Sequence, residues 1–199
     1  RVQDSQLEAG IASMELAFRM QSAVPEAFDL KAETEATRKL YGDNNFSKGC
    51  LLARRLAERG VRYIQVAGGN DIAWDTHGNT HDIRNLARNV DQGTAGLLRD
   101  LKARGMLDET LVVAVGEMGR TPKGNDAWGR GHWSHCFPCV LAGAGIRGGI
   151  TYGTSDKHAE YPIEDKVSPE DLARTIFWAL GVDPDIRLPD AQGRPTQII

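Results

Sequence analysis

Two polar segments of the chain hold side chains that commonly bind divalent metals. Each segment follows an apolar run, and together they supply four candidate ligands: Asp75, His77, Glu117 and His132. A mixed set of carboxylates and imidazoles suits zinc, manganese or iron better than calcium, which prefers oxygen ligands alone. Asp75 and His77 are two residues apart, so an extended backbone would point both side chains the same way. We therefore expect a divalent cation at these four residues, with zinc as first choice and manganese or iron as alternatives.

Two arginines of the second polar segment are candidates for binding an anionic substrate. Arg120 and Arg130 could each hold two ester oxygens, because a guanidinium presents a planar fork of donors. Equally, they could pair with Glu117 and Asp126, which is the commoner fate of a loop arginine. Glu117 could bind metal or act as a base, so Glu117 and Arg120 are the candidate catalytic residues. A purely structural role stays open for every residue named, because an isolated charged side chain in a polar loop is more often a turn residue or a helix cap.

Two further motifs lack the context that their usual chemistry requires. Gly143, Gly145 and Gly148 spell G-x-G-x-x-G, but a strand-like segment follows where a dinucleotide site needs a helix, which favours a glycine turn between strands. Cys136 and Cys139 form C-x-x-C, but a redox pair needs its first thiolate at a helix N-terminus, and this segment has the pattern of a strand. We expect two half-buried strand cysteines.

Helical periodicity predicts four helices among the elements that position these residues. Apolar residues recur at three- and four-residue spacing over residues 5–22, 47–59, 79–105 and 168–181. The first helix should end before Pro25, since proline interrupts a helix interior. Cys50 lies on an apolar helical stretch and is expected in the core. Residues 23–45, polar and weakly patterned, should form a helix-rich cover.

Start signals are clear for two of these helices. Asn79 or Thr80 can cap the third helix. The last helix has a complete signal, with Ser168 as its cap, Pro169 first inside and Asp171 three residues after the cap.

Three apolar, β-branched runs predict strands at residues 61–67, 111–116 and 137–143. Continuous apolar runs of this kind are typical of strands that are buried on both faces. Strands that alternate with helices predict an α/β protein with a mostly parallel sheet, as a single domain over residues 1–199. Ligands of such sheets bind outside the carboxyl ends of the strands, which is where the candidate metal ligands lie in the sequence.

Composition excludes several classes of partner. The formal net charge of -3 gives no reason to expect nucleic acid or an anionic membrane surface. No apolar run approaches the roughly 20 residues that a bilayer crossing needs. The chain begins with Arg1 rather than Met, so we expect it to be a piece of a longer protein.

Five stretches of the chain, in this order, resemble one bacterial family: "AWDTHGN", "LDETLVVAVGEMGRTP", "GRGHW", "VLAGAGIRGGITYGTSDK" and "VSPEDLARTIFWALGVDP". The chain is similar to the domain-of-unknown-function family fifteen-oh-one, which is related to sulfatases and alkaline phosphatases. The resemblance implies an alkaline-phosphatase-like α/β sandwich with a mostly parallel central sheet flanked by helices, incomplete in this chain. Because members are usually about twice as long, it also implies that this chain is the C-terminal half, and that its upstream half is a partner.

The resemblance also assigns roles to the candidate ligands. It implies that one cation is held by Asp75, His77 and His132, and that Glu117 takes the first place of a second pair of ligands. Met118 stands where the second histidine of that pair is expected. Export is a further implication, because family members often carry a twin-arginine signal.

The function implied is metal-dependent hydrolysis of a small phosphate or sulfate ester, with the nucleophile on the upstream segment. The alternative is a degenerate, non-catalytic metal-binding or structural module of the same fold. A phosphomutase would be a third interpretation, and no residue distinguishes it.

Overall fold

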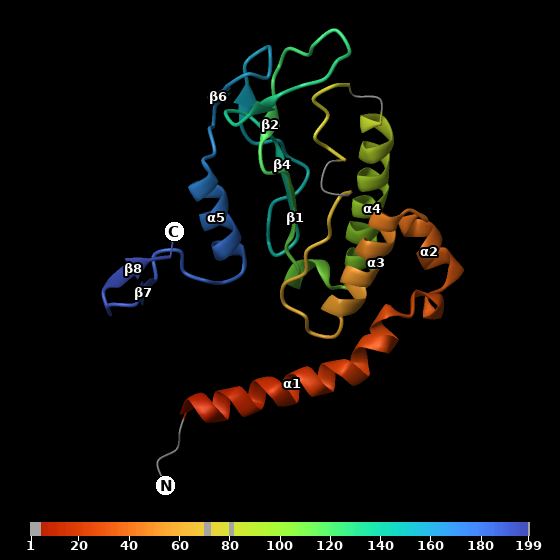
Figure 1. The fold of residues 1–199 in the computed structure, drawn as a ribbon, viewed down its shortest axis with the longest axis vertical. Helices are drawn as coiled ribbons and strands as arrows, with labels where there is room; N and C mark the ends of the chain where they lie inside the picture. Colours follow the sequence, from red (N-terminus) through yellow and green to blue (C-terminus); the bar gives the residue numbers. More distant parts are fainter. Residues whose placement is uncertain (1–4, 70–72, 80–81, 199) are drawn as a thin grey trace. The chain divides into compact units, whose positions relative to one another are not determined.

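The computed structural model of the chain describes all residues except 1–4, 70–72, 80–81 and 199 (Figure 1). The chain divides into two compact units. The first unit consists of Arg1–Asn70 with Ala87–Leu97, and the second of Asp71–Leu86 with Leu98–Ile199. Among the described helices, none has both the length and the apolar character that crossing a bilayer requires.

The first unit is helical. Its elements are α1 (Ser5–Phe28), η1 (Leu30–Ala32), α2 (Glu35–Tyr41), α3 (Asn45–Ala57) and residues 87–97 of α4 (Ile83–Ala103). Side chains cap both α2 and α3, since Thr34 Oγ1 accepts from the Thr37 amide at 3.1 Å and Asn44 Oδ1 accepts from the Ser47 amide at 2.9 Å. The helix-rich cover expected over residues 23–45 is confirmed.

The core of the first unit forms around three buried residues, Tyr41, Cys50 and Leu51. Partly buried apolar side chains pack against them: Leu30, Leu40, Phe46, Val66 and Leu97. The prediction that Cys50 lies in the core is confirmed. Burial also raises the pKa of the Cys50 thiol to about 12, so this thiol is inert at neutral pH.

A buried ion cluster joins helices of the first unit. Arg54 contacts Glu33 at 2.9 Å and Glu58 at 2.8 Å, and Arg55 also pairs with Glu33. Arg55 Nε donates to the Ala27 carbonyl at 2.7 Å, at the last turn of α1. The side chains of Arg54, Arg55 and Glu33 are 1%, 8% and 9% exposed. Such a cluster stabilises only while every member stays paired.

A long, irregular β-hairpin organises the second unit (Figure 1). Its outer strands are β1 (Val112–Val115) and β4 (Cys139–Ala142), and its inner strands are β2 (Gly119–Arg120) and β3 (His132–Trp133). The antiparallel register runs from the pair Val112–Ala142 to Val115–Cys139 and resumes at Gly119–Trp133. Between the two ladders, residues 116–118 oppose residues 134–138, which is an irregularity of the bulge kind.

The rest of the second unit is short elements. They are η2 (Leu107–Glu109), β5 (Thr154–Ser155), β6 (Pro162–Glu164), α5 (Pro169–Ala179), β7 (Arg187–Pro189) and β8 (Pro195–Gln197). Within the described residues, every sheet has two antiparallel strands.

The prediction of an alkaline-phosphatase-like sandwich with a mostly parallel sheet is therefore wrong. Parallel neighbours need a crossover of about a dozen residues or more, usually a helix, that returns the chain to the same end of the sheet. Between β1 and β4 the chain instead folds back as the inner hairpin, so β4 returns antiparallel. The strands are not buried on both faces either, since Val115 is 49% and Val140 is 54% exposed.

Two element predictions also need correction. Residues 61–67 form no strand ladder in the described structure, although Val66 packs on the core. Helix α1 continues past Pro25 to Phe28. The last turn of α1 is stabilised by α3, because Arg55 of α3 donates to the carbonyls of both Glu26 and Ala27.

Helix α5 confirms its start signal. Ser168 Oγ accepts from the Asp171 amide, and the Asp171 carboxylate accepts from the Ser168 amide, a reciprocal capping box with Pro169 first inside. At α4 the cap position is Asp82. Thr80, one of the two residues predicted there, lies outside the described residues.

Candidate metal centre

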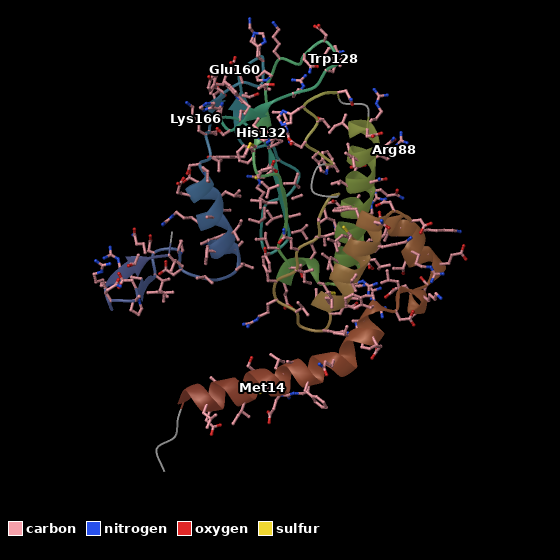
Figure 2. The ribbon with its side chains drawn as sticks, viewed as in Figure 1. Met14, Arg88, Trp128, His132, Glu160 and Lys166 are labelled. Atoms are coloured by element: carbon pink, nitrogen blue, oxygen red, sulfur yellow. The ribbon has the colours of Figure 1, made fainter. Side chains whose placement is uncertain are left out.

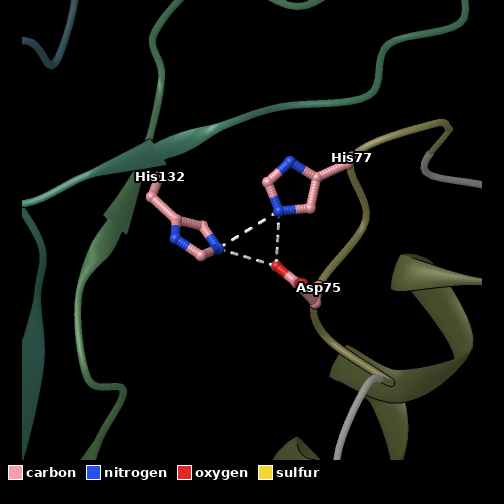
Figure 3. Close-up of side chains that lie close together, drawn as sticks. All are labelled: Asp75, His77 and His132. Atoms are coloured by element: carbon pink, nitrogen blue, oxygen red, sulfur yellow. Dashed lines mark hydrogen bonds and ion pairs between the residues drawn. The ribbon is translucent and has the colours of Figure 1, made fainter.

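Asp75, His77 and His132 converge on one point of the second unit (Figure 3). Asp75 and His77 lie in an irregular segment where two successive three-residue turns follow Trp74, and His132 lies on β3. The Nε2 atoms of both imidazoles are 2.9 Å from Asp75 Oδ1. The two Nε2 atoms are 3.1 Å apart. Three potential ligand atoms therefore form a nearly equilateral triangle.

Hydrogen bonds alone cannot satisfy this triangle. Each imidazole Nε2 carries either one proton or one lone pair in the plane of its ring. If both Nε2 atoms carry protons, the two N–H groups point toward each other. If only one carries a proton, the lone pair of the other Nε2 faces the Asp75 oxygen without a proton between them. A cation on the axis of the triangle would accept all three lone pairs together. The donor set thus fits a metal ion better than a purely hydrogen-bonded cluster.

The size of the triangle also fits a metal. With ligand bonds of about 2.1 Å, ligand atoms lie about 3.4 Å apart at tetrahedral angles and about 3.0 Å apart at octahedral right angles. The observed separations of 2.9, 2.9 and 3.1 Å match one face of an octahedron and are slightly compressed for a tetrahedron. The residue types are those of a two-histidine, one-carboxylate facial site, which would leave neighbouring coordination positions of a bound ion open to other ligands.

A guanidinium borders the triangle. Arg120 Nη1 donates to Asp75 Oδ1 at 2.6 Å. Hydrogen bonds from His132 and from Arg120 lower the pKa of the Asp75 carboxyl to about 2, against the opposing effect of burial. Asp75 is therefore an anion at any pH at which the imidazoles can bind metal. All three ligand side chains stay accessible, with 39–51% of each exposed.

The hairpin tip is joined to the segment that carries Asp75 and His77. The Arg130 amide donates to the Thr76 carbonyl at 3.0 Å, and Asn79 forms a β-bridge with Trp128. Gly129 is required by this contact, because a Cβ at that position would lie 2.0 Å from the His77 carbonyl oxygen. These backbone contacts bring His77 and His132, which are 55 residues apart in sequence, to one place.

The arginines predicted for substrate differ in what they contact. The Arg120 side chain is 22% exposed, and among the described residues its guanidinium donates to Asp75. Arg130 Nη1 instead donates to the carbonyls of Thr121 (2.7 Å) and Pro122. Its guanidinium thus closes the base of the loop in which it lies.

Glu117, the fourth candidate ligand, is exposed and is not part of the group. It lies in the irregular stretch between β1 and β2, whereas His132 lies on β3. Among the described residues, the triad is the one group of three or more acids, histidines or cysteines whose ligand atoms converge. Cys136 and Cys139 are both free; Cys136 is partly buried and Cys139 is exposed.

Two residues that support the site were not identified from the sequence. Asn125 Nδ2 donates to the His77 carbonyl, and Gly129 packs against the same carbonyl. Their only signal in the sequence is a turn-like composition, "GNDAWG", which predicts a loop but not what the loop contacts.

Fold and site together define an α/β protein whose β-hairpin and a neighbouring segment hold an exposed two-histidine, one-carboxylate group. The chain belongs to the family described as "Protein of unknown function (DUF1501)", whose model matches residues 1–199. The family expected from the sequence motifs is thus confirmed. No curated protein and no solved structure matches the chain.

Proposed function

We propose that Asp75, His77 and His132 bind a divalent metal ion, and that this centre belongs to a metal-dependent hydrolase of phosphate or sulfate esters. The observation that carries the proposal is the triangle of ligand atoms, 2.9–3.1 Å apart, beside a guanidinium. Zinc is the first choice from the ligand types, with manganese and iron as alternatives that suit the octahedral spacing of the ligand atoms better. Affiliation with the sulfatases and alkaline phosphatases rests on sequence motifs alone, as does placement in the C-terminal half of a longer protein.

Arg120 gives the site its preference for anions. One of its N–H groups donates to Asp75, and the remaining N–H groups of the planar fork can donate to an oxygen of a tetrahedral anion. A divalent ion at the triad would supply positive charge to a second ester oxygen and acidify a bound hydroxyl group. The nucleophile is proposed to come from a segment that precedes Arg1. Glu117 lies outside the triad, so its proposed role is at a second metal or as a base, and a substrate role for Arg130 would use the donors that its bonds to the Thr121 and Pro122 carbonyls leave over.

A second candidate function is a metal-binding module without catalysis. It is favoured by the single convergent group in the described residues and by Met118, which follows Glu117 where a second site would need an imidazole. The two candidates share the triad and differ in turnover.

Metal analysis tests the ligands. We expect His132→Ala and Asp75→Ala to lower zinc affinity by at least about 100-fold, the upper end of what supporting residues cost. His158→Ala removes an imidazole outside the triad and should bind zinc as the unaltered chain does. Equal metal content in all variants would refute the ligand assignment.

Turnover separates the two functions. A panel of aryl phosphates and aryl sulfates should be assayed with zinc, manganese and iron, on the chain with and without its upstream sequence. Hydrolysis that requires His132 supports the enzyme, and metal binding without any turnover by the longer protein supports the module.

A further inference from the structure

Three loops of the second unit are closed by the same side-chain pattern. Asn125 Oδ1 accepts from the amides two and four residues later, at 3.0 and 2.8 Å. Asp156 Oδ1 does the same at 3.0 and 2.9 Å, and Asp190 Oδ1 at 2.9 and 2.9 Å. An acceptor oxygen is therefore all that this turn requires, and a carboxylate serves as well as an amide.

Asn125 differs from the two aspartates in the other end of its side chain. Its Nδ2 donates to the carbonyls of His77 at 3.1 Å and Gly78 at 3.4 Å. Because Oδ1 faces two backbone donors, the orientation of the amide is set, and Nδ2 must point toward the segment of His77. In the two aspartate turns the second carboxylate oxygen accepts as well, from the Tyr161 amide at 3.2 Å and from Arg194 Nε at 2.8 Å. In the turn that contacts the segment of a proposed ligand, the residue is Asn and its second polar atom donates.

We infer that Asn125 is a positioning residue that holds His77 against His132 through its amide nitrogen. The inference rests on the proposed function, in which both histidines are metal ligands. Asn125 does not contact either imidazole nitrogen. It fixes the main chain at the carbonyls of His77 and Gly78, whereas Asp75 precedes His77 in the sequence. With Gly129 packed on the same carbonyl, it sets how far the two imidazoles lie from each other.

Asn125→Asp isolates the donor. It keeps the acceptor oxygen, as in the turns of Asp156 and Asp190, but places a negative charge beside two carbonyl oxygens. Asn125→Ser is the second variant, because a hydroxyl also accepts in such turns and introduces no charge. Asp190→Asn is the control, the reverse exchange in a turn that carries no proposed ligand; it also removes the ion pair between Asp190 and Arg194.

The first measurement uses metal-free protein. The ring centroids of His77 and His132 are 4.8 Å apart, close enough for a nuclear Overhauser contact between ring protons. Selective histidine labelling gives only five imidazoles to assign. We expect the contact in the unaltered chain and in Asp190→Asn, and its loss in folded Asn125→Asp and Asn125→Ser.

The second measurement is zinc affinity by competition with a chelator. Both Asn125 variants should bind zinc about 10–100-fold more weakly, as is usual for residues that orient a ligand. Asp190→Asn should bind zinc unchanged.

The outcomes separate the two proposals. Persistence of the imidazole contact in folded Asn125 variants would overturn the positioning role, and so would general unfolding of both. If the unaltered chain shows the contact but binds no zinc, manganese or iron, the metal centre fails, whereas the effect of Asn125 on the contact still decides this inference.

Discussion

At the scale of single residues, the candidate site depends on how closely two backbone segments approach. The three ligand atoms lie within hydrogen-bond distance of one another, and the contact between the segments passes through Gly129. The four candidate ligands were recognisable from their residue types, and three of them converge whereas Glu117 does not. The close approach was not predictable, since it is made by main-chain atoms that every residue has.

Gly129→Ala tests that approach. A Cβ at this position would meet the His77 carbonyl oxygen at 2.0 Å, so the segments must separate. We expect a loss of about 1–3 kcal/mol in the free energy of unfolding, as for other overpacked positions, together with weaker zinc binding. Gly131→Ala is the control in the same loop, because its Cβ would meet only Thr121 Cγ2 at an ordinary 3.5 Å. Urea unfolding and zinc titration of both variants check the prediction, which equal behaviour of the two would contradict.

At the scale of elements, local signals were reliable where they depend on neighbouring residues. The capping box of α5 uses residues three apart, and the structure has it as predicted. Strand pairing depends on residues far apart in sequence, and it was wrongly predicted. The runs at 111–116 and 137–143 do contain strands, but their apolar character could not reveal that residues 116–138 fold back between them.

Ser168→Ala should destabilise α5. The substitution removes the acceptor of the Asp171 amide and half of the capping box, which costs about 1 kcal/mol. Ser168→Asp retains a good cap and should change the free energy of unfolding by only a few tenths of a kcal/mol. Hydrogen exchange of the first-turn amides of α5, with urea unfolding, measures both. Equal stability of the two variants would show that the cap contributes nothing.

At the scale of the whole molecule, sequence periodicity predicted only part of what stabilises the first unit: it predicted the core position of Cys50 but not the charged cluster. The first unit buries a cluster of charges, Glu33 with Arg54 and Arg55, and a pattern of apolar residues does not predict such a cluster. Conversely, α1 has its predicted periodicity, yet its apolar stripe is exposed: Leu7 61%, Ile11 45%, Met14 76% and Phe18 75%, with Met14 labelled in Figure 2. Periodicity predicts a helix with an apolar face, and it is silent on what covers that face.

The charge cluster makes the first unit sensitive to acid. Burial would raise the pKa of Glu33, but hydrogen bonds from Arg54 and Arg55 and their charges outweigh it, so the pKa is lowered from its ordinary 4.5. A carboxyl with a lowered folded-state pKa stabilises the fold above its unfolded-state pKa, and this stabilisation is lost as the pH falls through the folded-state value. We expect the free energy of unfolding to fall below about pH 4.5 as Glu33 takes up a proton.

Glu33→Gln provides the control for that titration. At pH 7 the variant leaves two buried arginines short of a partner and should lose about 3 kcal/mol. The difference from the unaltered chain should shrink as the pH falls, because protonated Glu33 resembles Gln. Glu35→Gln removes an exposed pair with Lys39, whose side chains are 72% and 75% exposed, and should have little effect. A pH-independent difference for Glu33→Gln would contradict the assignment.

The reliance on one amide group at Asn125 also bears on how the protein ages. Asparagine is among the thermally labile residues, and loss of ammonia from its side-chain amide, followed by hydrolysis, yields aspartate together with isoaspartate. At the solvent-exposed Asn125, both products lack the amide nitrogen, and the aspartate product is identical to Asn125→Asp without any change in the gene. Stored preparations should therefore lose zinc affinity in step with the fraction of molecules deamidated at Asn125, as peptide mass spectrometry would measure it. Freshly purified protein, rather than aged stock, is the proper reference for every metal titration.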